Sequence, residues 1–325
     1  MGPRPMDVHA TGRRSPRALY ATLLVAVLAA RGSALAEEPR AAEPAVAAAP
    51  APYSLPWQLR PAVAATVLRV DTALAFYEGQ SGGSGETVAT MILGSYKLTP
   101  ELAPFVRLGV VGNSPPTGVG GAVVLVNPAL GATYALKFAR DFRLALFLGL
   151  TVPVGMGGGK PSEDPRALAR SSGVLARSAM DNAMFAVNDF TVFPGVGLAY
   201  VAHGLTVQAE ATLLQLTRVR NAAAQPDSSK TNFTTGLHVG YFVLPLLSAG
   251  AELRYQRWLS TPAAVAADAT GASRDTLSVA AGARLHLRVG ESTWLRPGIA
   301  YARGLDDPMA RQDYHIVQVD LPVAF

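Results

Sequence analysis

The sequence contains no cysteine among its 325 residues, which excludes both disulfide bonds and thiolate metal sites. Long apolar runs are also scarce, although apolar residues make up 50% of the chain. The one long run, residues 18–30, is too short to cross a bilayer as a helix. If the chain is a membrane protein, its apolar residues must therefore be distributed in another pattern.

The apolar run has the surroundings of a secretory signal. Arg13, Arg14 and Arg17 precede it, and the small-residue sequence Ala34-Leu35-Ala36 follows it. This order predicts a signal peptide over residues 1–36, cleaved before Glu37. The Arg13-Arg14 pair does not indicate a twin-arginine signal, because the residues after it do not fit one.

The excess of positive charge belongs mostly to this leader. The whole chain carries 28 Lys and Arg against 23 Asp and Glu. Five of these basic residues and one acid lie in residues 1–36, which leaves 23 basic and 22 acidic residues in the predicted mature chain. A net charge of +1 does not indicate a nucleic-acid surface, so we expect no nucleic-acid partner.

Residues 37–56 follow as a predicted linker. The stretch from Glu37 to Pro52 is built almost entirely of Ala, Pro and Glu. Such a segment has too little apolar side chain to offset the entropy of ordering, so we expect a flexible periplasmic linker. The remaining residues, 57–325, form the predicted folded domain.

From residue 57 onward, apolar and polar residues alternate with a period of two over segments of 10 to 15 residues, with turn-forming residues between them. This pattern is typical of transmembrane β-strands. Twelve strands are predicted, at 57–77, 87–98, 104–113, 129–138, 142–152, 190–202, 205–218, 231–243, 247–258, 275–289, 293–302 and 314–325.

The connections between these segments alternate in length. The even-numbered strands are followed by the short links 99–103, 139–141, 203–204, 244–246 and 290–292, whereas the odd-numbered strands are followed by long ones. Bacterial barrels have short periplasmic turns, long external loops and an even number of strands. The alternation therefore predicts an antiparallel up-and-down barrel with both termini on the periplasmic side.

The last strand carries the family resemblance. Val317, Val319, Leu321, Val323 and Phe325 share one face, and the polar side chains between them share the other. This stretch resembles the closing strand of Gram-negative outer-membrane β-barrels, in which a terminal Phe is the usual assembly signal. The resemblance covers residues 57–325 at the level of architecture. It implies outer-membrane lipid and the barrel-assembly machinery as partners, and it supplies no functional residues.

The face opposite the lipid side is rich in charge. Parity assigns these residues to the lumen: Arg69, Asp71, Lys97, Arg107, Lys137, Arg143, Glu210, Arg218, His238, Glu252, Arg254, Arg284, His286, Arg288, Arg296 and Asp320. The turns set His238 opposite Glu252, His286 opposite Arg296 and Lys137 opposite Arg143. Two interpretations stay open: ion-pair networks that fill the interior, and a solute pathway with a cationic bias.

An outer-membrane hydrolase is the enzymatic alternative. His238 and Glu252 supply a base and an orienting acid, but the strand register sets no nucleophile beside them. The glycine-rich run at residues 155–160 lacks the spacing of a phosphate-binding loop. We therefore predict no catalytic activity, no cofactor and no metal site.

The longest external connection, residues 153–189, has helical character. Asp164 is a candidate cap for a helix that begins at Pro165, although residues 171–173 weaken it and allow two short helices. Arg166, Arg170 and Arg177 fall on one face, opposite Leu168, Leu175 and Ala179. Either this segment caps the surface, or it enters the barrel mouth and its arginines line a constriction that favours anions.

The sequence thus predicts an all-β fold, a twelve-stranded transmembrane barrel in the outer membrane of a Gram-negative bacterium. The favoured function is a passive channel or uptake barrel for small solutes. The alternative is a structural or surface-interaction barrel with a filled lumen.

Overall fold

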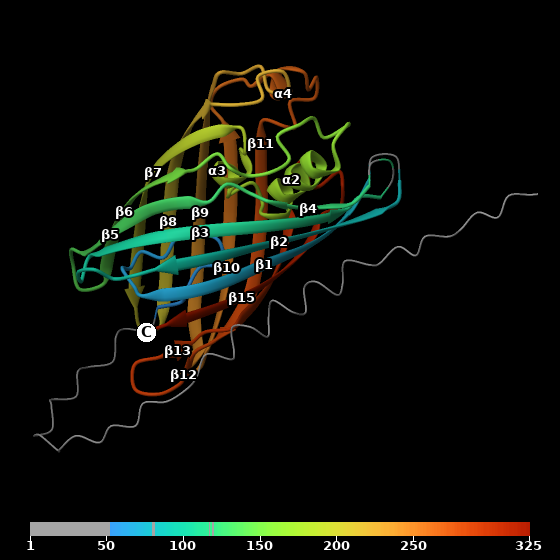
Figure 1. Ribbon diagram of the computed structural model, residues 1–325. Helices are drawn as coiled ribbons and strands as arrows, with labels where there is room; N and C mark the ends of the chain where they lie inside the picture. Colours follow the sequence, from blue (N-terminus) through green and yellow to red (C-terminus); the bar gives the residue numbers. More distant parts are fainter. Residues whose placement is uncertain (1–52, 80–81, 117, 119) are drawn as a thin grey trace, which may run out of the picture. The chain divides into compact units, whose positions relative to one another are not determined.

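The computed structural model describes residues 53–325 except for residues 80, 81, 117 and 119. The signal peptide and residues 37–52 of the predicted linker lie outside the described residues. Figure 1 shows long strands that curve around a common axis, with two helices between them toward one end. We name the two ends of this structure the short-turn end and the long-loop end, after the connections found there.

The strands form one closed antiparallel barrel with twelve strand positions around its wall. The strands are β1 (Val67–Glu78), β2 (Ser84–Ser95), β3 (Leu102–Ser114), β4 (Ala122–Leu125), β5 (Ala129–Lys137), β6 (Phe142–Thr151), β7 (Asp189–Ala202), β8 (Leu205–Arg218), β9 (Ser229–Leu244), β10 (Leu247–Trp258), β11 (Asp275–Leu285), β12 (Leu287–Arg288), β13 (Trp294–Leu295), β14 (Gly298–Gly304) and β15 (His315–Ala324). β11 and β12 together occupy one of these twelve positions, and so do β13 and β14. β4 pairs only with β3. The barrel closes where β1 pairs with β15, with Val67 opposite Ala324. The predicted fold class is confirmed.

The alternation in the sequence has the expected structural consequence. Leu237, Val239 and Tyr241 of β9 are exposed on the outer face, and His238 between them is buried on the inner face. In β15, Val319 is exposed while Gln318 and Asp320 are buried. The exterior is therefore largely apolar, as a barrel surrounded by lipid requires, whereas the interior combines polar and charged side chains with an apolar cluster that includes Met91, Phe147 and Leu216.

The short turns keep this alternation in register. His203 and Gly204 both have positive φ, 51° and 80°, which is the conformation of a two-residue hairpin turn. At the next short turn, the predicted three-residue link 244–246 would set Val243 opposite Leu247, and this pairing was wrong. Leu247 pairs with Leu244 rather than with Val243, and a bulge follows before Ser248. The bulge restores the predicted parity, since His238 lies opposite Glu252.

The first predicted strand begins too early. β1 starts at Val67, whereas residues 57–66, which the sequence assigned to a strand, form irregular structure. This segment and residues 53–56 before it lie in the lumen, and we call residues 53–66 the N-terminal insert. The short strand β4 was not predicted, and the predicted strands over 275–289 and 293–302 are each interrupted, at His286 and at Arg296-Pro297.

The loop between β6 and β7 contains α2 (Pro165–Ala176) and α3 (Asn182–Phe185), and α4 (Ala263–Ala266) lies in another loop at the same end. Asp164 caps α2 as predicted, because its side chain accepts a hydrogen bond from the Arg166 N–H at 2.9 Å. The loop contains two helices, but residues 171–173 lie inside α2 and do not divide it, so the predicted break at these residues was wrong. Among the described residues, no helix is long and apolar enough to cross a bilayer.

The buried face of α2 differs from the predicted one. Its buried residues are Ala167, Ala169, Ser172, Gly173 and Ala176, whereas the leucines at 168 and 175 are only half-buried. Small side chains let the helix backbone approach β1, β2, β3 and β4 closely. A Cβ on Gly173 would lie 2.5 Å from the Phe185 ring and 2.9 Å from Val111, so only glycine fits there. The loop consequently packs inside the wall of the barrel.

Candidate functional site

The N-terminal insert occupies the lumen near the short-turn end. Trp57 and Leu59 are 3% and 1% exposed, and Tyr53 and Ala62 are also buried. The insert forms neither strand nor helix, so its backbone polar groups need partners from the barrel wall. The wall supplies them through inward-facing side chains.

Two wall carboxylates hold the backbone of the insert. Glu252 accepts hydrogen bonds from the N–H of Trp57 and, at 3.1 Å, from the N–H of Gln58. Glu210 accepts one from the N–H of Arg60 and forms an ion pair with the Arg60 guanidinium at 2.6 Å. Carboxylates that accept from backbone N–H groups form charge-assisted hydrogen bonds, which are stronger than neutral ones.

Aromatic contacts complete the seat of the insert. The Arg284 guanidinium carbon lies 4.5 Å from the centroid of the Trp57 ring, and that of Arg60 lies 4.2 Å from the centroid of Phe147. The wall also leaves room for the insert. A Cβ on Gly298 would lie 2.7 Å from the Trp57 ring, so glycine is required at that position of the wall.

The loop that contains α2 and α3 is held by a second set of ion pairs. Arg177, which is 0% exposed, donates to both carboxylate oxygens of Asp71 at 2.7 and 2.8 Å and to Asp181 at 2.8 Å. Arg107 of β3 also forms a bidentate pair with Asp181. The wall and the inserted loop are thus joined by two arginines and two carboxylates that alternate.

The charges in this cluster support one another. Burial alone would raise the pKa of the Asp181 carboxyl, but the guanidiniums of Arg107 and Arg177 hold that pKa well below its usual range. Burial alone would lower the pKa of Arg177, and Asp71 and Asp181 raise it above the ordinary value. The cluster joins two guanidiniums to two carboxylates, so its formal charges sum to zero.

A third network lies across the closing strands. Asp320 of β15 accepts a hydrogen bond from Arg69 Nε at 2.8 Å and pairs with Arg284 through its other oxygen. Arg254 donates to Glu252 at 2.9 Å and to the Gln318 side chain at 2.7 Å. Because these networks use charges from both the wall and the inserts, much of the lumen between the inserts is neutralised internally.

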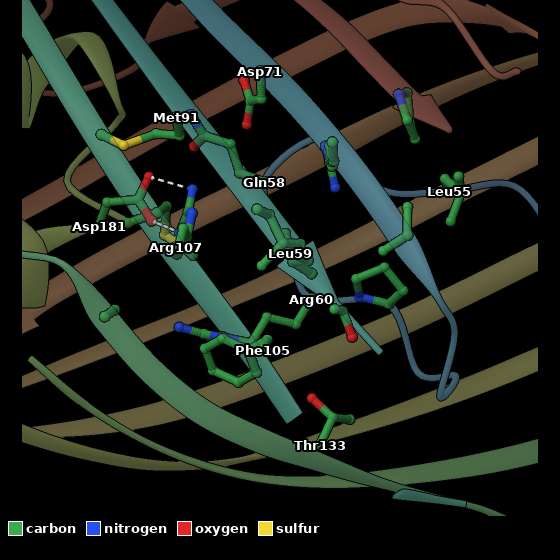
Figure 2. A pocket seen from close by; sticks show the side chains of 18 of the residues that line it. Leu55, Gln58, Leu59, Arg60, Asp71, Met91, Phe105, Arg107, Thr133 and Asp181 are labelled. Carbon is green, nitrogen blue, oxygen red and sulfur yellow. Dashed lines mark hydrogen bonds and ion pairs between the residues drawn. The ribbon is translucent and has the colours of Figure 1, made fainter. Parts of the chain in front are cut away.

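A central cavity of about 150 Å³ remains between the N-terminal insert and the inserted loop. Figure 2 shows Leu59 and Arg60 of the insert on one side of it and Asp181, paired with Arg107, on another. Met91 and Phe105 line the wall between them. The cavity therefore offers both apolar surface and paired charges.

The remaining predicted lumen residues have different environments. His238, Arg284 and His286 are buried, and Arg143 lies with its guanidinium carbon 5.4 Å from the Tyr53 ring centroid. Arg296 is half-buried beside Trp294. In contrast, Lys97 and Lys137 are exposed at the short-turn end, and they join none of the ion-pair networks that fill the lumen.

The three arginines predicted on one face of the external helix have separate environments. Arg166 is exposed, Arg170 is half-buried and donates to the backbone carbonyls of Gly157 and Phe185, and Arg177 is fully buried. The helix ends at residue 176, so Arg177 leaves the helical face and turns toward Asp71. Arg177 pairs with two carboxylates, Asp71 and Asp181, so it does not present an unpaired positive charge to an anion.

One Ser–His contact was missed by the sequence reasoning. Ser248 Oγ lies 2.8 Å from His286 Nε2, at the short-turn end of the lumen. The imidazole contacts the Phe242 ring at 4.4 Å between centroids, and within the described residues no carboxylate hydrogen-bonds to it. A nucleophile needs a base that a third group orients. The described part of the chain also contains no cluster of three residues suited to hold a metal ion.

Two signals in the sequence point to the insert. Pro56 lies just before the predicted first strand and Pro61 lies inside it, and proline is disfavoured in a strand that pairs on both sides. Glycines at inward-facing positions, such as Gly240 and Gly298, mark places where another part of the chain approaches the wall. The partners of these glycines could not be found without the three-dimensional arrangement.

Comparison with known proteins identifies the architecture. No family model and no curated protein matches the chain. Among solved structures, a COG4313 outer membrane channel from Pseudomonas putida F1 is similar over 83% of this chain and 98% of that one, with 14% identity and a TM-score of 0.53. The fold is that of an outer-membrane β-barrel.

More distant matches include the NanC porin, with 11% identity and a TM-score of 0.45 over 79% of this chain and 98% of that one. The β domain of the Bordetella autotransporter BrkA matches with 13% identity and a TM-score of 0.42, over 81% of this chain and 99% of that one. At such identities the likeness extends to the fold of the barrel and not to its solute.

Proposed function

We propose that this protein is an outer-membrane channel for small solutes that the N-terminal insert closes from the periplasmic side. The observation that carries the proposal is how the insert is held. Its backbone is bound through side chains of the wall, chiefly Glu210 and Glu252, and not by pairing with the strands. A segment held in this way can leave its seat while the barrel stays intact.

Orientation and surroundings follow from the barrel type. We assign the short-turn end to the periplasm and the long-loop end to the outside, as in other bacterial barrels. The exposed apolar side chains of the wall would contact outer-membrane lipid, and β15 with its terminal Phe325 would be the segment that the barrel-assembly machinery binds. Export through a signal peptide at residues 1–36 and a linker at 37–56 belongs to the same proposal.

The central cavity supports a pathway between the two inserts. It lies where a solute would rest if the N-terminal insert closed behind it, and its lining combines Met91 and Phe105 with charged groups. Most of those charges are paired with one another, but within the described residues Arg296 adds a guanidinium that has no carboxylate partner. We propose that solutes move passively along this pathway.

A second function is favoured by a different observation. Arg177 is fully buried and pairs with Asp71 and Asp181 at once, so the inserted loop is fixed firmly to the wall. A loop fixed in this way would suit a barrel whose filled lumen stiffens it for a structural role or for contacts at the surface. An outer-membrane hydrolase is a weaker candidate, because the Ser248–His286 pair lacks an orienting acid.

Conductance in planar bilayers separates these functions. We expect the full chain to conduct weakly and a variant that lacks residues 53–62 to conduct in larger, discrete steps. The matched control shortens an exposed loop instead, by deleting residues 269–271, and should conduct like the full chain. Heat-modifiable migration on gels establishes that each variant is folded.

Two results would count against a channel closed by the insert. If the folded deletion variant conducts no more than the full chain, the insert does not close the pathway. If a further deletion of residues 161–185 is also silent, the barrel has no pathway and the structural function is the better one.

A further inference from the structure

A second cavity lies at the long-loop end, apart from the central cavity. It has a volume of about 230 Å³ and lies between the inserted helices and the ends of β9, β10 and β11. The residues that line it are Arg170, Val174, Leu175, Ala179, Asn182, Phe185, Ala186, Asp189, Gln225, Lys230, Gln256, Trp258, Ser273, Thr276 and Pro308. We call this space the loop cavity. Since an engineered cavity of about 150 Å³ admits benzene, this space has room for a small organic molecule.

The loop cavity has an excess of positive charge. Lys230 pairs with Asp189 at 2.8 Å, so these two side chains neutralise each other. Arg170 donates Nε to the Gly157 carbonyl at 2.9 Å and Nη1 to the Phe185 carbonyl at 3.3 Å. Across the described residues, no carboxylate lies within ion-pair distance of Arg170. Asp189 and Asp164 act on Arg170 only from beyond ion-pair distance, so its half-buried guanidinium still attracts an anion.

The other lining groups favour hydroxyls and a flat apolar face. Asp189, Gln256 and Thr276 are buried and polar, and Ser273 Oγ is buried without a hydrogen-bond partner among the described residues. Trp258 is half-buried at the end of β10, and its indole forms part of the cavity wall. Cavities that bind small molecules combine apolar surface with a few polar groups that fix the orientation of the ligand.

We propose that the loop cavity binds a small organic anion that carries several hydroxyl groups, of the size of one sugar acid. The carboxylate of this ligand pairs with Arg170. Its hydroxyl groups exchange hydrogen bonds with polar groups of the cavity lining, and one face of its ring lies against Trp258. The site would select acidic over neutral sugars, because only an acidic sugar compensates the charge of Arg170.

The inference deepens the proposed function by naming a solute class, and it rests on that function only for the later passage of the solute. Binding to the folded barrel in detergent does not require conductance. If the barrel conducts but does not bind, the inference fails alone, and if it binds but never conducts, the proposed channel fails alone.

The experiment uses the full chain, folded in detergent, with glucuronate as the probe and calorimetry as the readout. We expect saturable binding of glucuronate and at least tenfold weaker binding of glucose. Arg170→Gln should weaken glucuronate binding at least tenfold, and Arg170→Lys should restore part of it. Arg166→Gln is the matched control, since Arg166 lies on the same helix but is exposed, and it should bind like the unaltered chain.

Loss of the Arg170 hydrogen bonds could also displace the loop, so a variant in the wall gives an independent test. Trp258→Leu removes the indole face without touching α2, and we expect at least fivefold weaker binding. Heat-modifiable migration establishes folding in every case. The inference is overturned if the unaltered chain shows no saturable binding, if glucose binds as well as glucuronate, or if either folded variant, Arg170→Gln or Trp258→Leu, keeps the full affinity.

Discussion

Arg177 and Asp71 lie 106 positions apart in the sequence and form a bidentate ion pair inside the barrel, with N···O distances of 2.7 and 2.8 Å. Asp71 belongs to the wall and Arg177 to the inserted loop, so this pair fixes the depth at which the loop lies. Both side chains are buried. Removal of either one would leave the charge of the other buried and uncompensated.

The first prediction concerns this pair. Loss of one partner of a buried pair costs about 3–5 kcal/mol. We expect Asp71→Asn to lower the free energy of unfolding by about 3 kcal/mol, near the lower end of that range, because Asp181 still pairs with Arg177. Urea titration of the folded barrel measures the change. Glu163→Gln is the control, since Glu163 belongs to an exposed pair with Lys160, and a similar loss there would contradict the assignment.

The second prediction is a pH dependence that arises from Asp181. Its pKa is lowered in the folded protein, so its carboxylate contributes stability that is fully present above the ordinary pKa of a free carboxyl. That contribution is lost as the pH falls from there toward the lower pKa of the folded state. At pH values below about 4, we expect a fall in the temperature at which heating changes the migration of the barrel on gels. In the Asp181→Asn variant, the fall in this temperature at acid pH should be smaller. An unchanged dependence on pH would exclude Asp181 as the source of the fall.

The third prediction tests the seat of the N-terminal insert. A Cβ on Gly298 would lie 2.7 Å from the Trp57 ring, whereas one on Gly197 would have no neighbour closer than 3.8 Å. Gly298→Ala should therefore displace the insert and raise conductance, and Gly197→Ala should not.

The same substitution can be followed by chemical labelling, because the natural chain has no cysteine. Ala62→Cys places a thiol at a position that is 1% exposed. We expect slow reaction with a maleimide, and faster reaction when Gly298→Ala is present. Equal rates in both backgrounds would mean that the insert keeps its place.

The fourth prediction concerns the end of the chain. The backbone N–H of Phe325 donates to the Thr66 carbonyl at 3.1 Å, and its side chain is exposed. We expect Phe325→Ala to reduce the amount of folded barrel in the outer membrane severalfold, if the terminal aromatic is the assembly signal. Phe138→Ala, at another exposed aromatic near the short-turn end, should have little effect. Equal losses in the two variants would indicate a general aromatic contribution instead.

The barrel could be predicted from the sequence because a strand in lipid has to alternate. Each outward side chain faces hydrocarbon and each inward one faces polar groups, so the sequence around His238 and Glu252 reports both the face and the pairing. The parity of a two-residue turn such as His203-Gly204 then fixes the register of the next strand. These rules depend only on residues that are close in the sequence, so a single sequence is enough to apply them.

The contents of the lumen could not be predicted in the same way. Trp57-Gln58-Leu59-Arg60 alternates like a strand, but its partners are Glu210 and Glu252, far along the chain. The helix α2 was expected to bury its leucines, and it buries its small residues because the curved wall leaves space only for a close approach. Packing inside a closed ring depends on contacts between distant segments, and periodicity carries no information about those contacts.

The course of the N-terminal insert has a mechanical consequence. Tyr53 packs against Val201 near the short-turn end, the middle of the insert reaches Glu210, and Thr66 returns to the same end beside Phe325. The insert is therefore a U-shaped excursion, and it can leave the barrel without any part of the chain threading through the ring. Tension on the chain ahead of Tyr53 would load the hydrogen bonds from Ser54 to Thr206 and from Trp57 to Glu252 one after another. Bonds that break in series yield at a lower force than bonds that share the load.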